Sequence, residues 1–331
     1  MKYLVTGATG FIGGHVVRQL AEAGHQVTAL VRDPSRAREL GQLGITLHRG
    51  DVTDKESMRQ PMSGVDGLFH IAAWYKIGDS HAEAAEQINV QGTRNVLDLM
   101  QELAVPKGVY TSTLAVFSDT EGKLVDESYR HNGPFLSEYD RTKWFAHYEV
   151  ALPGMQQGLP LVIVQPGVVY GPGDASLIRE TFVQYLQRKL PMIPKKTAFC
   201  WARVEDTARG HIQAMDKGKP GESYIIAGPK HTLEEVFEIA EGITGIKATR
   251  LRLSPGIVKV MAAIMKVAGA MIPLPASYTS ESLRVIAGST YLGDNRKAVR
   301  ELSFQVRPLK EGLEETLRYE MKLLERGKMK G

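Results

Sequence analysis

The chain has little cysteine and no long uncharged hydrophobic run. Its 331 residues include one cysteine, Cys200, which excludes an internal disulfide and a metal site with four cysteine ligands. The most membrane-like stretch, Ile257–Ile272, is sixteen residues long and contains Lys259 and Lys266, so it is too short and too charged to span a bilayer. We expect a helix that lies in the core or covers a pocket; contact with lipid or with an apolar ligand is the alternative.

Blocks of like charge, an apolar leader and metal-ligand spacings are also missing. The net charge of +4 comes from scattered basic residues, which gives no indication of a nucleic-acid partner. Residues 1–6 reach polar side chains and glycine too early for a secretory signal, and we expect a cytoplasmic protein with no membrane span. His70, His81 and His147 lack the spacing of a metal site, so we predict no metal.

The most informative feature that is present is a glycine-rich turn over residues 6–13. It follows a short apolar run, Tyr3–Val5, and leads into an amphipathic stretch. A strand, a glycine turn and a helix in this order form the site at which a dinucleotide pyrophosphate binds. Gly7 permits the tight turn, Gly10 lets the phosphates approach the backbone, and Gly13 lets the helix pack closely on the strand. An ordinary structural turn is the alternative.

Apolar runs alternate with helical periodicity along the first half of the chain. The helical stretches include Glu83–Leu103 and Ser137–Ala151, and this alternation predicts an α/β fold with a doubly wound Rossmann parallel sheet. The apolar runs expected to form its strands are Tyr3–Val5, Gln26–Val31, Ile45–Leu47, Gly67–Ile71, Val109–Thr111 and Leu161–Val164.

The pattern changes after Gln165, where proline and glycine become frequent. We predict a dinucleotide-binding domain over residues 1–165, to which later segments such as 204–228 return, and a mainly substrate-binding, mostly helical region over residues 166–331. The ligand is expected between the two, at the carboxyl ends of the strands. The helices expected in the second region are Leu177–Lys189, Leu233–Ile243, Ile257–Met271 and Leu309–Leu324.

Tyr139 and Lys143 are four residues apart, which places both on one face of a helix. A nearby lysine cation favours the ionised form of a tyrosine, whose ordinary pKa is near 10. Such a pair can exchange a proton with an alcohol or carbonyl while hydride moves to or from a nicotinamide. Upstream, a predicted strand ends in three successive hydroxyls, Thr111, Ser112 and Thr113, at the edge where a parallel sheet binds ligands.

With these motifs the sequence resembles the extended short-chain dehydrogenase/reductase family, also called the NAD-dependent epimerase/dehydratase family, over nearly the whole chain. The resemblance implies that Tyr139 is the acid/base and that Lys143 assists it and binds the nicotinamide ribose. Thr113 occupies the position of the catalytic serine or threonine, and Ser112 is the alternative contact for the substrate oxygen. Besides the glycine turn, the matching segments are Gly50–Val52, His70–Ala73, Asn89–Leu97, Pro166–Gly173, Val204–Asp206 and Tyr224–Gly228.

The resemblance also implies which residues hold the cofactor and how the protein assembles. Related proteins are often dimers that pair through the helices that here include Glu83–Leu103 and Ser137–Ala151, so we expect a homodimer. The cofactor-binding residues it implies are Gly7, Thr9, Gly10, Phe11, Ile12, Gly13, Arg32, Asp51, Val52, Ala72, Ala73, Asn89, Thr111, Tyr139, Lys143, Pro166, Val168 and Val169.

The end of the second strand distinguishes the two nicotinamide cofactors. An acidic residue there binds the ribose 2′-hydroxyl of NAD, whereas an arginine receives the 2′-phosphate of NADP. Arg32 stands at this position, with Ser35, Arg36 and Arg38 nearby, which favours NADP(H). Asp33 is close enough to keep NAD(H) as the alternative.

The segment Val31–Pro34 is also similar to the dihydroflavonol reductase-like branch, whose members reduce ketones or aldehydes with NADPH. Leu114 and Ala115 stand where sugar-nucleotide 4,6-dehydratases carry an Asp-Glu pair, and Phe199 stands where epimerases commonly carry an arginine. We predict an NADP(H)-dependent reductase or dehydrogenase that interconverts a carbonyl and an alcohol on a small, partly apolar molecule. One alternative is a sugar or sugar-nucleotide epimerase with retained NAD(P), in which Arg203 or the pair Lys195 and Lys196 replaces that arginine. The other alternative is a non-catalytic NADP-binding regulator.

Aromatic side chains near these motifs are candidates for an apolar substrate pocket. Such side chains are often simply part of the core, which is the alternative. The five candidates are Trp74, Tyr75, Phe117, Tyr170 and Trp201.

Overall fold

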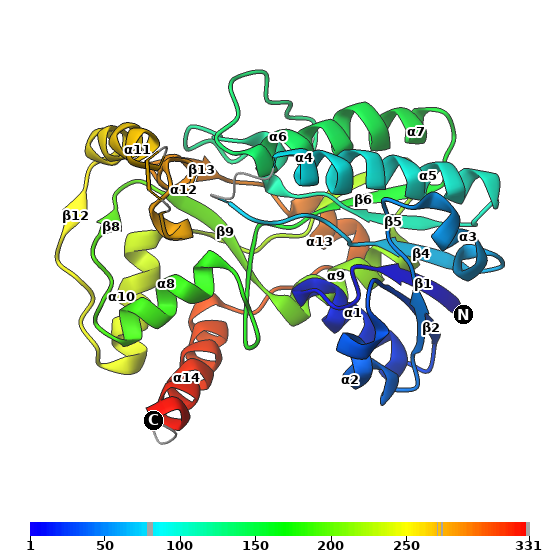
Figure 1. Ribbon diagram of the computed structural model, residues 1–331, viewed down its shortest axis with the longest axis horizontal. Helices are drawn as coiled ribbons and strands as arrows, with labels where there is room; N and C mark the ends of the chain where they lie inside the picture. Colours follow the sequence, from blue (N-terminus) through cyan, green and yellow to red (C-terminus); the bar gives the residue numbers. More distant parts are fainter. Residues whose placement is uncertain (78–81, 270, 273, 329–331) are drawn as a thin grey trace.

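The computed structural model describes residues 1–77, 82–269, 271–272 and 274–328, and its central layer is a seven-stranded parallel sheet (Figure 1). The strands lie in the order β10-β6-β5-β4-β1-β2-β3, so the direction of winding reverses between β1 and β4. This is the doubly wound Rossmann sheet that the alternating pattern predicts. Its strands are β1 (Lys2–Thr6), β2 (Gln26–Val31), β3 (Thr46–Arg49), β4 (Gly67–His70), β5 (Gly108–Thr111), β6 (Leu161–Gln165) and β10 (Ser223–Ile225).

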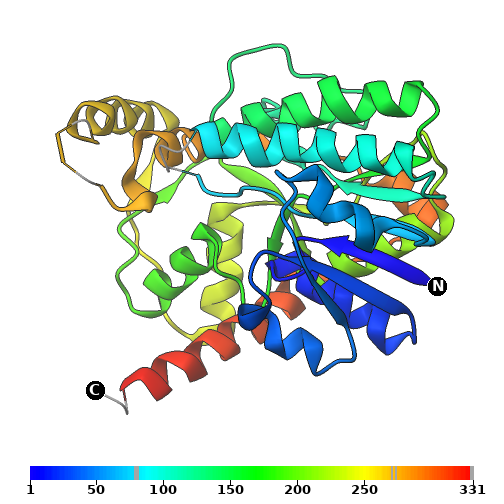
Figure 2. The same cartoon turned by 45° about the vertical axis from the view of Figure 1, so that its right-hand side comes forward.

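Helices cover both faces of this sheet (Figures 1 and 2). The strands are apolar on both sides because each face is buried against a helical layer. One face packs on α1 (Phe11–Glu22), α2 (Arg38–Gly41), α9 (Val204–Lys217) and α13 (Arg296–Leu302). The other packs on α3 (Lys55–Met62), α5 (Gly92–Glu102), α7 (Leu152–Gln156) and the segment Ala146–Ala151.

The two long predicted helices are each interrupted by a π-helical segment. The first consists of α4 (Ala82–Ala85), the π-helical residues 86–91 and α5. The second consists of α6 (Glu138–Phe145), the π-helical residues 146–151 and α7. A period of 3.6 residues predicts a helix but does not reveal the wider turns within it.

The rest of the chain forms a second core around a smaller sheet. This sheet contains β7 (Val168–Tyr170), β9 (Ala198–Arg203), β11 (Lys230–Thr232) and β13 (Thr290–Tyr291), and a separate pair joins β8 (Ile193–Pro194) to β12 (Arg252–Leu253). Around them lie α8 (Leu177–Leu186), α10 (Leu233–Thr244), α11 (Pro255–Gly269), α12 (Ser280–Val285) and α14 (Leu309–Lys328).

Helix α11 differs from the expected core or pocket-covering helix. Its residues Val258 and Ala262 are buried against α12, and Met265 contributes to the same cluster. The opposite face is also apolar but is exposed, so the expectation holds for one face only. Among the described residues, no helix is long and apolar enough to cross a membrane.

Candidate active site

A cavity of about 1870 Å³ lies where the parallel strands end and the second core begins. It is larger than the roughly 300–1,000 Å³ that holds one drug-sized ligand, so it has room for a dinucleotide and a second molecule. Its lining includes residues that follow directly after β1, β2, β3, β4, β5 and β6. This is the edge at which doubly wound sheets bind ligands.

The glycine turn forms one wall of the cavity and fits a dinucleotide. Gly7 has a φ of +72°, and a Cβ there would lie 2.6 Å from the Ala72 amide nitrogen. A Cβ on Gly13 would collide with the Gly7 carbonyl oxygen. Gly10 caps α1, and no side chain caps the first turn of this helix. The positive end of α1 is therefore open to the cavity at the place where a pyrophosphate would bind.

The charged residues after β2 have different surroundings. The Asp33 carboxylate accepts hydrogen bonds from the backbone N–H and the hydroxyl of Ser35, at 3.0 and 2.6 Å, and these bonds lower the pKa of Asp33. It also lies 3.4 Å from the guanidinium of Arg36. Arg32 is exposed and lines the cavity, whereas Asp33 does not. At the end of β3, the Asp51 carboxylate accepts from the N–H and hydroxyl of Thr53, both at 2.9 Å.

The three successive hydroxyls after β5 have three different partners. The Thr111 hydroxyl lies 2.9 Å from Nε2 of His211, and the Ser112 hydroxyl lies 2.7 Å from Nδ1 of His147. Burial lowers the pKa of His211 to about 4 and that of His147 to about 3, so both imidazoles are neutral at pH 7. The Thr113 hydroxyl instead accepts from the Ala115 N–H at 3.1 Å.

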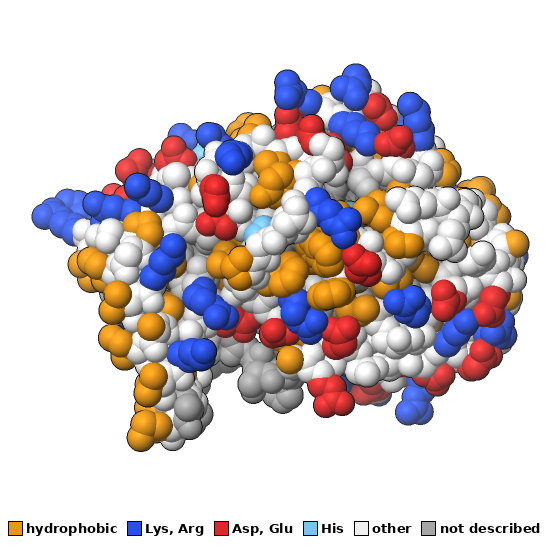
Figure 3. Space-filling view, turned by 90° about the horizontal axis from the view of Figure 1, so that it is seen from above, with side chains coloured by type: hydrophobic (Ala, Val, Ile, Leu, Met, Phe, Trp, Pro, Cys, Tyr) orange, Lys and Arg blue, Asp and Glu red, His pale blue; other side chains and the backbone are white. Residues whose placement is uncertain are grey.

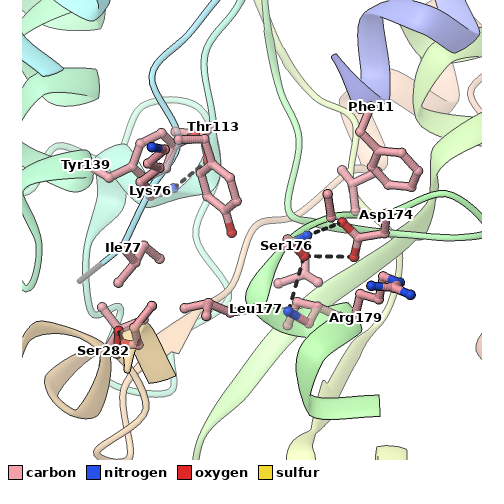
Figure 4. A pocket seen from close by; sticks show the side chains of 18 of the residues that line it. Phe11, Lys76, Ile77, Thr113, Tyr139, Asp174, Ser176, Leu177, Arg179 and Ser282 are labelled. Carbon is pink, nitrogen blue, oxygen red and sulfur yellow. Dashed lines mark hydrogen bonds between the residues drawn. The ribbon is translucent and has the colours of Figure 1, made fainter. Parts of the chain in front are cut away.

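Tyr139 lines the cavity beside Thr113 (Figure 4). Its ring packs edge-on against Tyr75, with ring centroids 4.9 Å apart. Burial is the largest cause that raises the pKa of Tyr139 above its usual value, and the neighbouring Thr113 hydroxyl lowers it by less. The phenol therefore carries its proton throughout the neutral range.

Lys143 is held one turn along α6 by two oxygen atoms of β5. Its Nζ donates to the Tyr110 hydroxyl at 3.0 Å and to the Thr111 carbonyl at 2.8 Å. The side chain is buried, and this burial lowers the pKa of Lys143 to about 7. The ammonium group is thus positioned by β5 and shielded from water, although it is protonated only in part at neutral pH.

All but one of the predicted cofactor-binding residues line this cavity; the exception is Asn89. The Asn89 side chain accepts from the Trp74 N–H at 2.7 Å and donates to the Trp74 carbonyl and to Thr142 at 3.1 and 2.9 Å. It therefore joins the segment after β4 to α6 from behind the cavity wall. Those in the lining are Gly7, Thr9, Gly10, Phe11, Ile12, Gly13, Arg32, Asp51, Val52, Ala72, Ala73, Thr111, Tyr139, Lys143, Pro166, Val168 and Val169.

The five aromatic pocket candidates separate into two groups. Trp74, Tyr75 and Trp201 line the cavity. Phe117 and Tyr170 do not: both are fully buried in the second core, where Phe117 packs edge-on against a tyrosine and Tyr170 packs against Trp201. The core alternative therefore describes these two side chains, because the backbone directs them away from the cavity.

The structure adds residues that the sequence pattern did not single out. Tyr110 holds Lys143, and no motif indicated it. His147 follows Lys143 by four residues, so helical spacing places it on the same face and was a usable signal. Asp140 accepts from the Ser137 and Tyr291 hydroxyls at 2.6 and 2.9 Å, and burial raises its pKa to about 7.

Across the cavity from Tyr139 lie Phe11, Asp174 and Arg179 (Figure 4). Arg179 forms an ion pair at 2.9 Å with Glu320, which is itself buried. His70 is buried between Thr6 and Thr93, and His81 lies outside the described residues.

Comparisons with known proteins agree with the family resemblance and with the fold. The sequence model of the NAD dependent epimerase/dehydratase family matches residues 3–227. "Putative dihydroflavonol 4-reductase" of Synechocystis sp. is 33% identical over 325 residues, which cover 96% of this chain and 94% of that protein. "Sterol demethylase protein B" of Methylococcus capsulatus is 31% identical over 264 residues, 78% of this chain and 79% of that protein. Among solved structures, that of gox2253 has a TM-score of 0.83 at 28% identity and covers 97% of this chain and 98% of its own.

Proposed function

The chain belongs to the NAD dependent epimerase/dehydratase family and is an enzyme of the oxidoreductase type, and we propose that it is an NADP(H)-dependent reductase or dehydrogenase. Its substrate pair is a carbonyl and an alcohol on a small, partly apolar molecule. The observation that carries this proposal is the meeting of Thr113, Tyr139 and Lys143 in the wall of the same cavity as the glycine turn. Its apolar lining, which includes Trp74 and Trp201, suits a substrate with apolar parts.

The bound cofactor supplies a hydride, and the residues of this chain manage the proton. The Tyr139 hydroxyl, protonated at neutral pH, donates to the carbonyl oxygen and transfers its proton as that oxygen gains negative charge. The Thr113 hydroxyl donates to the same oxygen and holds it in place. Lys143, fixed by Tyr110 and the Thr111 carbonyl, offsets the negative charge left on the phenolate.

The surroundings of Arg32 support NADP(H) as the cofactor. Its guanidinium lies in the cavity wall, and no acidic side chain of the described residues forms an ion pair with it. The neighbouring carboxylate of Asp33 is already bound by Ser35 and Arg36. A free arginine at this position suits the 2′-phosphate, and an occupied carboxylate is poorly placed for the 2′-hydroxyl of NAD.

The epimerase alternative is weakened by the ion pairs of Arg203. This side chain is buried and pairs with Glu205 and Glu315, and it does not line the cavity. Lys195 and Lys196 do not line the cavity either. A sugar nucleotide carries a diphosphate, which needs cations or backbone donors that face it.

Replacing Tyr139 tests the reaction. A panel of ketones and aldehydes is incubated with NADPH, and Tyr139→Phe is expected to lower kcat about 10²- to 10⁴-fold while leaving NADPH affinity unchanged, because only the transferred proton is lost. Tyr75→Phe is the matched control, since its ring also lines the cavity and it should retain turnover. Undiminished turnover in Tyr139→Phe would remove this residue from the mechanism.

The same assay separates the alternatives. A reductase consumes one NADPH for each alcohol formed, whereas an epimerase turns over with no net change in cofactor. NADPH binding without turnover on the whole panel would instead support a regulator.

Replacing Arg32 tests the cofactor. The wild type is expected to bind NADPH more tightly than NADH, and Arg32→Ala should reduce that preference at least ten-fold, since a charge-assisted bidentate contact is lost. Arg326→Ala is the control, because Arg326 of α14 is exposed and outside the cavity lining. Dissociation constants come from nicotinamide fluorescence. A preference that survives in Arg32→Ala would contradict the assignment.

A further inference from the structure

Helix α11 carries an apolar stripe that faces solvent. Its residues Ile257, Val260, Ile264 and Val267 follow a spacing of three, four and three residues, which places them on one helical face. Between 50% and 68% of each side chain is exposed. Met271 and Ile272, just beyond the helix, are exposed by 81% and 57%. Figure 3 shows hydrophobic side chains along the left edge of the molecule, the end at which α11 lies in Figure 1.

Helix α11 packs on the protein through other side chains, which are not part of this stripe. Val258 and Ala262 are buried in a cluster with Leu283 and Ala287, and Met261 and Met265 pack against them. The helix is therefore anchored to α12 by one apolar face, while a second apolar face remains uncovered. Such a face is retained on a soluble protein when it binds something.

The segment that contains α11, residues 242–280, has basic side chains but no acidic ones. No acidic residue occurs between Gly242 and Ser280, and the segment contains five basic residues: Lys247, Arg250, Arg252, Lys259 and Lys266. Its formal charge of +5 exceeds the +4 of the whole chain, so the remaining residues together carry −1. Arg252 is paired at 3.8 Å with Glu234, which lies outside the segment. Lys259 and Lys266 are seven residues apart and share the side of the helix between the stripe and the buried face. Within the described parts of the chain neither has an ion pair with an acidic side chain.

An apolar face bordered by lysine is typical of a helix that lies in the surface of a membrane. A second copy of the chain fits this charge less well, because a two-fold interface would bring two basic segments together. Anionic lipid headgroups provide the complementary charge. The stripe belongs to a helix of 15 residues, so it can lie on a bilayer but not span one.

The stripe is next to the cavity. Met265, Lys266 and Gly269 of α11 line it, as do Leu274 and residues 276–279 that follow. The same short segment therefore presents apolar side chains to solvent and forms part of the cavity wall.

We propose that α11 docks on the surface of an anionic lipid bilayer through Ile257, Val260, Ile264 and Val267, with Lys259 and Lys266 at the headgroups. Docking brings the cavity wall to the membrane surface, where an apolar substrate collects. The arrival of substrate from the bilayer rests on the proposed function; the docking does not.

Vesicle co-sedimentation tests the docking without cofactor or substrate, so its failure leaves the proposed reaction untouched. The intact protein is mixed with vesicles of phosphatidylcholine alone or of phosphatidylcholine with phosphatidylglycerol. We expect binding to the anionic vesicles only, and weaker binding at high salt because the lysines are screened.

The double variant Val260→Ser/Ile264→Ser should bind at least ten-fold more weakly, as two exposed apolar side chains are lost. Lys259→Gln should bind about five-fold more weakly.

Matched control variants remove the same number of exposed apolar or lysine side chains at positions away from α11. Leu124→Ser/Val299→Ser removes two exposed apolar side chains, and Lys322→Gln removes one exposed lysine of α14; both should bind as the wild type does. Circular dichroism checks that each variant is folded. Absence of binding by the wild type, equal binding to neutral vesicles, or equal losses in the controls would overturn the proposal. It would also be overturned if sedimentation velocity showed that the stripe variants dissociate a dimer while vesicle binding is unchanged.

Discussion

At the scale of single residues, the three hydroxyls after β5 show how position along a strand selects a role. Thr111 and Ser112 are each engaged by a buried neutral histidine, His211 and His147 respectively. The Thr113 hydroxyl accepts from the Ala115 N–H and lies beside Tyr139 in the cavity wall (Figure 4). The sequence left Ser112 and Thr113 as alternatives, and we propose Thr113 as the contact for the substrate oxygen because the Ser112 hydroxyl is engaged by His147.

Substitution of these two residues is expected to separate activity from stability. Thr113→Val should lower kcat about 10²- to 10³-fold, since a donor to the reacting oxygen is removed, and Thr113→Ser should restore most of it. Ser112→Ala should keep kcat/KM near that of the wild type but lower the free energy of unfolding by about 1–3 kcal/mol, because the His147 ring loses a buried partner. Steady-state kinetics and urea unfolding measure the two effects. The reverse pattern would assign the oxygen contact to Ser112.

At the scale of elements, the junction of β1 and α1 depends on the absence of side chains. The Gly10 N–H donates to the Gly7 carbonyl at 2.9 Å, which closes the turn from which α1 starts. Gly13 packs against that same carbonyl. The turn thus needs glycine at Gly7 for its φ and at Gly13 for the close approach of helix and strand.

Two neighbouring glycines of α1 allow a matched comparison. Gly13→Ala should lower the free energy of unfolding by about 1–3 kcal/mol and weaken NADPH binding, because the added methyl group pushes the Gly7 carbonyl away. In Gly14→Ala the added Cβ would lie 3.5 Å from the Ala8 carbonyl oxygen, an ordinary contact. That variant should be as stable as the wild type or up to about 1 kcal/mol more stable, since alanine favours the helix. Equal effects at both positions would show that helix propensity, not the contact, matters; urea unfolding and nicotinamide fluorescence decide this.

The π-helical segments are the feature of the elements that periodicity did not reveal. His147 lies in the segment of residues 146–151, directly after α6, and from there it reaches Ser112. Asn89 lies in the other π-helical segment and bonds to the Trp74 backbone. Both segments place polar side chains of the helical layer against the cavity wall.

At the scale of the whole molecule, folding buries a lysine. Lys143 keeps two hydrogen bonds but loses the hydration of its charge, which lowers its pKa to about 7 from 10.5 in the unfolded chain. Between these pH values the unfolded chain binds a proton that the folded protein does not. The free energy of unfolding contributed by this group therefore rises with pH across the window from about 7 to 10.5, and the full penalty of burying the charge is present below it.

Lys143→Met removes this titration. The free energy of unfolding of the wild type, minus that of Lys143→Met, should increase with pH between 7 and 9 by about 1 kcal/mol per pH unit, in the ligand-free proteins. The two proteins share every other titrating group, Asp140 included, so the difference isolates Lys143. Urea unfolding at pH 7, 8 and 9 measures it. A difference that is constant with pH would mean that Lys143 keeps an ordinary pKa in the folded protein.

The sequence by itself determined the local features, because strand alternation, glycine turns and helical spacing act between residues that are near each other in the chain. The doubly wound sheet, the glycine turn and the shared face of Tyr139 and Lys143 belong to this group. The position of Arg32 directly after β2 likewise marked it as a candidate contact for the cofactor, without any knowledge of distant segments.

The tertiary structure decided the contacts between distant segments, which depend on packing and burial. It directed Phe117 and Tyr170 into the core, paired Arg203 with Glu205 and Glu315, and gave Lys143 its partner Tyr110. It also exposed one apolar face of α11, although the residues alone favoured burial. A hydrophobic pattern states which side chains avoid water, but only the assembled chain shows which of them find a neighbour.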